Sequence, residues 1–203
     1  WAFRLNSARG AKSASHKTYF RKILSCYKSK LRRFGDKKKM SFQLNPSPKN
    51  YKDFYGRNVD QMPKLIAEGR TPLSVAGLME VRLKYGKELR DWMNNYFDTG
   101  DGVIYHPDGR IKIVHDSQLI RELSPKSPLK NSALVLEDGV YGSVQGQEFK
   151  KSDFEKYTGK KLSAKAVKKN PLWQALARGD QNLLNEYTNF IFSEAKENFK
   201  YDK

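Results

Sequence analysis

Two histidines, each close to an aspartate, form the clearest grouping of acid–base side chains in this sequence. His106 is followed by Asp108, and His115 by Asp116. A histidine beside a carboxylate can act as a general base at neutral pH, because its unperturbed pKa is about 6.5. The grouping predicts either a proton-transfer site or two partly buried histidines on neighbouring strands.

The turn between the two histidines decides whether they could act together. Asp-Gly at the centre of a two-residue loop is the favoured hairpin turn, and it would pair Pro107 with Arg110. In that register His106 lies opposite Ile111, and the two imidazoles share one face about four residues, or roughly 13 Å, apart. Metal–ligand bonds are about 2 Å long, so the two histidines are not expected to share a metal.

Other catalytic and cofactor-binding motifs are absent from the sequence. It has no glycine-rich phosphate loop of a nucleotide-binding protein, no hydrolase nucleophile elbow and no His-Glu-x-x-His zinc motif. Gly100-Asp101-Gly102 precedes an expected strand, which favours a turn. Cys26 is the single cysteine, which excludes an internal disulfide and a thiolate zinc site. We predict no cofactor and no metal, and an enzyme with a site around His106 and His115 stays an alternative.

The hydropathy of the chain indicates a protein of the cell interior. No window approaches about 18 consecutive apolar residues, and no basic stub precedes the apolar run of a secretory signal. A single cysteine fits a reducing compartment. We therefore expect a cytoplasmic protein without a membrane span.

The net charge of +17 is concentrated at one end of the chain. Residues 1–39 contain 13 Lys or Arg and one acid, Asp36, whereas the other 164 residues contain 26 Lys or Arg and 21 acids and contribute only +5 to the net charge. A basic excess of this kind is typical of proteins that bind DNA or RNA.

Residues 1–39 have two interpretations. In the first they form a basic, helical arm along phosphates, because apolar residues recur at helical spacing with basic residues between them. The apolar positions are Phe20, Ile23, Leu24, Tyr27, Leu31 and Phe34, and the candidate contacts are Lys17, Arg21, Arg32 and Arg33. In the second the segment is not native protein, because Met40 is the first methionine and the residues before it match a translated purine-rich ribosome-binding tract.

Residues 40–203 are predicted to form a single helix-rich α+β domain. Helices are expected at 60–68, 71–85 and 86–97, at 117–123, and through most of the chain after residue 152. Ser163, Asn170-Pro171 and Asp180 are expected to begin three of the later helices. The pairs 103–106 with 111–116 and 134–136 with 140–141 predict one or two β-hairpins, which would form a small antiparallel sheet packed by helices.

The order helix, helix, hairpin over 71–115 matches a winged helix-turn-helix, in which the second helix enters a groove and the hairpin touches the nucleic-acid backbone. The candidate contacts are Lys87 and Arg90 on the helix and Arg110 and Lys112 on the hairpin. Nucleic-acid binding, to DNA or RNA, is therefore the first functional hypothesis.

Two further features leave the function open. A second basic cluster precedes Trp173, but a solvated helix face explains it equally well; it comprises Lys160, Lys161, Lys165, Lys168 and Lys169. The alternative function is a non-catalytic protein-interaction or structural accessory protein. The 11 Tyr, 11 Phe and 3 Trp favour it, because aromatic side chains supply interface anchors.

Overall fold

The computed structural model describes residues 18–22, 51–158 and 162–200, with backbone only for 18–22 and 198–200. The helices in these ranges are α1 (Asn58–Ala67), α2 (Val75–Tyr85), α3 (Asp91–Asn94), α4 (Gln118–Arg121), α5 (Val140–Ser143), α6 (Lys151–Thr158), α7 (Ala164–Lys168), α8 (Pro171–Leu176) and α9 (Gln181–Lys200). The strands are β1 (Thr18–Lys22), β2 (Gly102–Tyr105), β3 (Arg110–Val114), β4 (Leu129–Lys130), β5 (Ala133–Leu136) and β6 (Gln147–Lys150). The fold is α+β, as predicted.

One antiparallel sheet connects all of these strands in the order β4-β5-β1-β2-β3-β6. The hairpin β2–β3 and the edge strand β6 form one unit, and the short hairpin β4–β5 forms another. Strand β1 lies between the units, because it pairs with β2 on one side and with β5 on the other. The predicted helix that begins near Phe20 is therefore wrong for 18–22, and the rest of that arm lies outside the described residues.

The hairpin register differs from the predicted one by a single residue. Ile111 pairs with Tyr105, and the backbone N–H of His106 donates to Arg110 at 2.9 Å. The loop thus has three residues and ends at Gly109, whose φ of +94° is the left-handed conformation that a three-residue hairpin loop needs. Since side chains alternate between faces, a one-residue shift moves every side chain of β3 to the other face relative to β2.

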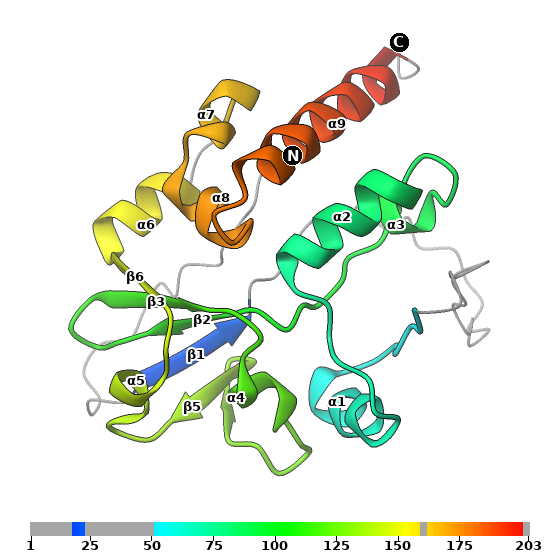
Figure 1. Ribbon diagram of the computed structural model, residues 1–203. Helices are drawn as coiled ribbons and strands as arrows, with labels where there is room; N and C mark the ends of the chain where they lie inside the picture. Colours follow the sequence, from blue (N-terminus) through cyan, green and yellow to red (C-terminus); the bar gives the residue numbers. More distant parts are fainter. Residues whose placement is uncertain (1–17, 23–50, 159–161, 201–203) are drawn as a thin grey trace, which may run out of the picture.

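The larger helical layer covers one face of this sheet. Figure 1 shows α2, α3 and α6 to α9 on this side. Val103, Ile111 and Ile113 of the hairpin are at most 1% exposed and pack against Met79, Phe154, Val167, Leu172, Trp173, Leu176, Leu184 and Tyr187. This core fixes the three C-terminal helices α7, α8 and α9 to the sheet.

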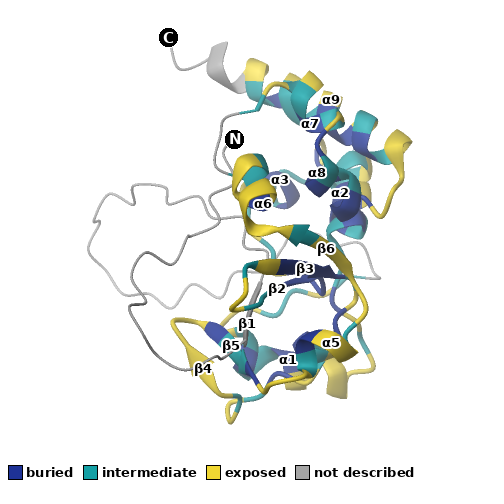
Figure 2. Cartoon of the chain, turned by 90° about the vertical axis from the view of Figure 1, so that its left-hand side faces the viewer, coloured by how far each residue is buried: buried dark blue, intermediate teal, exposed yellow. Residues whose placement is uncertain are grey.

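A smaller layer covers the opposite face. Helices α1, α4 and α5 lie there, and Figure 2 shows the buried strands β2 and β3 between the two layers. Ile104 and Val114 pack with Val59, Met62, Ile120, Leu123, Leu136 and Tyr141. The hairpin is therefore the centre of a helix–sheet–helix arrangement.

Two other predicted elements are wrong. Only one helical turn, α3, forms within 86–97, because Arg82 donates to the carbonyls of Trp92 and Asn95 and the chain continues extended from Asn95. The predicted partner strand at 140–141 is helix α5, which follows Gly139 at φ +90°. Strand β5 pairs instead with β4 and β1.

Candidate functional site

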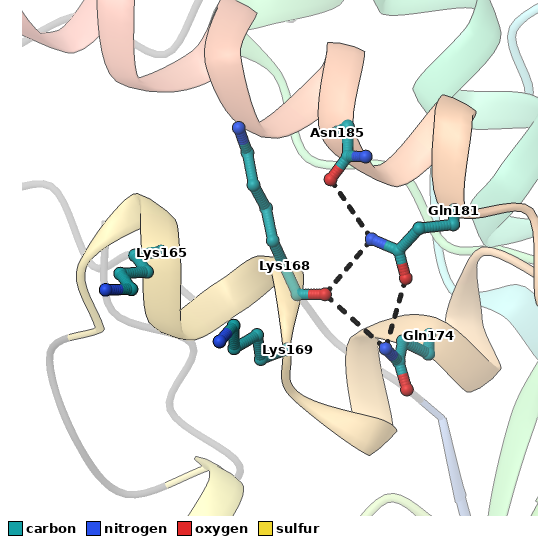
Figure 3. A pocket seen from close by; sticks show the side chains of 6 residues that line it. All are labelled: Lys165, Lys168, Lys169, Gln174, Gln181 and Asn185. Carbon is teal, nitrogen blue, oxygen red and sulfur yellow. Dashed lines mark hydrogen bonds between the residues drawn. The ribbon is translucent and has the colours of Figure 1, made fainter.

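An open hollow of about 470 Å³ lies between α7, α8 and α9. Its lining residues come from all three helices and are Lys165, Lys168, Lys169, Gln174, Gln181 and Asn185. Figure 3 shows the lysines on the α7 side and the amide side chains on α8 and α9. Three short-range capping interactions build the walls of this hollow, which we call the lysine–amide cleft.

The caps explain why three helices begin so close together. The Ser163 hydroxyl accepts from the N–H of Ala166 at 3.3 Å, and the Asn170 side chain accepts from the N–H of Leu172 at 2.9 Å. The Asp180 carboxylate accepts from the N–H of Leu183 at 2.9 Å. Each cap satisfies a helix N–H that would otherwise lack a partner. These three predicted helix starts are confirmed.

Hydrogen bonds hold the amide side of the cleft in place. The backbone carbonyl of Lys168 accepts from Gln181 Nε2 at 3.1 Å and from Gln174 Nε2 at 3.5 Å. Gln174 Nε2 also donates to Gln181 Oε1 at 3.1 Å, and Gln181 Nε2 donates to Asn185 Oδ1 at 3.0 Å. The end of α7 is thereby joined to α8 and α9 (Figure 3).

The cleft is positively charged. Three of its six lining residues are lysines and none is an acid. Lys168 Nζ donates to Asn189 Oδ1 at 2.7 Å, a neutral partner, and within the described ranges none of the three lysines forms an ion pair with a carboxylate. The exposed ammonium groups of Lys165 and Lys169 are thus available to an anionic ligand, and Lys168 has ammonium hydrogens left besides the one that binds Asn189.

The structure changes the interpretation of the hairpin candidates. Lys112 is 5% exposed, and its ammonium donates to the carbonyls of Tyr141 at 2.7 Å and Val144 at 2.9 Å. It cannot contact phosphate, because α5 covers its face of the sheet. Arg110 is exposed, but it is paired with Asp108 at 2.8 Å.

The helix candidates do not form a recognition surface either. Arg90 is paired with Glu194 of α9, and Lys87 is exposed in the link before α3. Trp92 and Met93 of α3 are buried, and a helix of four residues is too short to serve as the recognition helix of a helix-turn-helix. The structure brings Arg110 and Lys112 near Tyr141, whereas Arg90 lies against Glu194 in the other helical layer. Arg21 lies in β1 with its side chain undescribed, and Lys17, Arg32, Arg33, Lys160 and Lys161 lie outside the described residues.

The two histidines lie on opposite faces of the sheet, so the prediction of a shared face is wrong. His106 packs against the Tyr141 ring, with centroids 4.8 Å apart, and its Nδ1 lies 2.6 Å from Asp108. The hydrogen bond from the Arg110 N–H, together with the His106 and Arg110 side chains, lowers the pKa of Asp108 to about 2. This group stabilises the exposed hairpin loop.

His115 belongs to a second group, centred on the completely buried carboxylate of Asp101. Asp101 accepts from the backbone N–H of Val75 at 2.7 Å and of Asp116 at 3.0 Å. His115 Nδ1 lies 3.4 Å from Asp101 Oδ1, within ion-pairing distance, but it has no aligned hydrogen-bond partner in the described part of the chain. Arg178 lies 3.6 Å from Asp101 and 2.6 Å from Asp116. The group holds the starts of α2 and β2 against the end of β3 and the α8–α9 turn. Its role is therefore structural.

Only the lysines of the cleft could be identified from the sequence. The lysines were visible as a basic run, but a solvated face explained them equally well. Of the amides, Gln181 and Asn185 could have been predicted to lie side by side, because they are four residues apart and so share a helix face. Gln174 could be placed beside them only by the fold.

Comparisons with protein-family models, curated proteins and solved structures found no match to the chain. Among the described residues, no three His, Cys, Asp or Glu side chains are grouped so that they could hold a metal ion. No helix in these same ranges is long and apolar enough to cross a membrane. The lysine–amide cleft is therefore a candidate site on the basis of its lining residues, without support from a related protein.

Proposed function

We propose that the protein binds nucleic acid and that the lysine–amide cleft supplies phosphate contacts. The observation that carries the proposal is the composition of the cleft, which has three lysines and no carboxylate in its lining. Lysine ammonium groups bind phosphate as point charges, and the net charge of +17 attracts polyanions over a longer range.

The cleft replaces the hairpin as the centre of the interface. The hairpin is buried between two layers, whereas Lys165 and Lys169 are exposed. Phosphate binding also suits a site without metal ligands, since it needs only positioned cations and hydrogen-bond donors.

The test compares two triple variants of the full chain. In the first, Lys165, Lys168 and Lys169 are changed to Gln; in the second, the matched control, Lys64, Lys126 and Lys130 are changed to Gln. The control removes the same charge from the opposite side, in α1, after α4 and in β4.

Affinity for a mixed-sequence oligonucleotide is measured against salt concentration. Each phosphate contact contributes about 0.7 to 0.9 to the slope of log affinity against log salt, so the cleft variant is expected to lower the slope by about 2. The control is expected to lower it by less than about 1. Equal losses in the two variants would show diffuse attraction and exclude the cleft, and the absence of salt-dependent binding in the unmodified chain would refute the function.

A further inference from the structure

We draw no further inference here: the strongest candidate, the group of Asp101, His115 and Arg178 between the end of β3 and the α8–α9 turn, already has a structural role in holding these elements together, and nothing in the described part of the chain shows what ligand it would bind.

Discussion

Changing Asp101 to Ala should destabilise the protein more than any exposed charge change. The Asp101 carboxylate is 0% exposed and accepts two backbone hydrogen bonds, from Val75 and Asp116. A hydrogen bond to a charged group contributes about 1.5 to 3 kcal/mol, and each N–H left buried without a partner costs about 1 to 3 kcal/mol. We expect a loss of about 4 kcal/mol in the free energy of unfolding. In a chain of this length that corresponds to a fall of about 8 to 16 °C in Tm.

Urea unfolding followed by tryptophan fluorescence measures this loss, because Trp92 and Trp173 are both buried. The matched control is Asp116→Asn, which removes the exposed partner of Arg178 and keeps a residue that tolerates the φ of +45°. An exposed ion pair contributes about 0 to 1 kcal/mol, so the control should lose less than 1 kcal/mol. A loss in the Asp101 variant no larger than in the control would refute the reasoning.

The same carboxylate predicts a pH dependence with a definite sign. Burial alone raises the pKa of Asp101, but His115 and the N–H groups of Val75 and Asp116 outweigh burial, so its pKa lies below the ordinary value. The resulting stability is fully present above the unfolded pKa of about 3.9 and is lost as the pH falls through the lower, folded pKa. The stability difference between the unmodified chain and Asp101→Asn should therefore shrink as the pH falls below about 4. A difference that grows with acid would contradict the assignment.

Three further substitutions probe the opposite face of the sheet. Lys112→Ala leaves the carbonyls of Tyr141 and Val144 without their donor and should cost about 2 to 4 kcal/mol in urea unfolding, with no change in nucleic-acid salt slope. Tyr141→Phe removes a buried hydroxyl that has no hydrogen-bond partner among the described residues, so the variant should be as stable as the unmodified chain or more stable. Burial raises the pKa of Tyr141 to about 12, so the free energy of unfolding of the unmodified chain should fall between about pH 10 and 12, and the variant should lose this dependence. Gly146→Ala places a methyl group 2.3 Å from the Ile113 carbonyl and should lower Tm by several degrees.

Features that depend on local chemistry could be predicted from the sequence. Ser163, Asn170 and Asp180 each cap a helix with a side chain bonded to a nearby N–H, so their effect needs no distant partner. The α+β class followed from the periodicity of apolar residues in the same way. Gly109 correctly indicated a hairpin, but the choice between a two- and a three-residue loop moved the register by one position and placed the histidines wrongly.

Features that depend on distant contacts could not be predicted. The apolar stripe around Trp92 and Met93 suggested a long helix, but Arg82 binds the end of that segment and limits it to one turn. Strand β6 has no β-branched residue and forms because β3 offers it an edge. Lys112 occupies a strand position that would ordinarily face solvent, and helix α5, which was predicted as a strand, buries it.

The candidate site combines both kinds of information. Its lysines were visible as a charged run and its walls begin at predictable caps, but the direction of its three amides could not be predicted from the sequence. That direction depends on the Lys168 carbonyl, which is brought to Gln174 and Gln181 only when α7, α8 and α9 pack on one core. A charged run alone predicts attraction to any polyanion. The positions of the three lysines around one hollow predict a larger fall in salt slope than the loss of three lysines elsewhere, which is why the matched lysine control tests the site rather than the total charge.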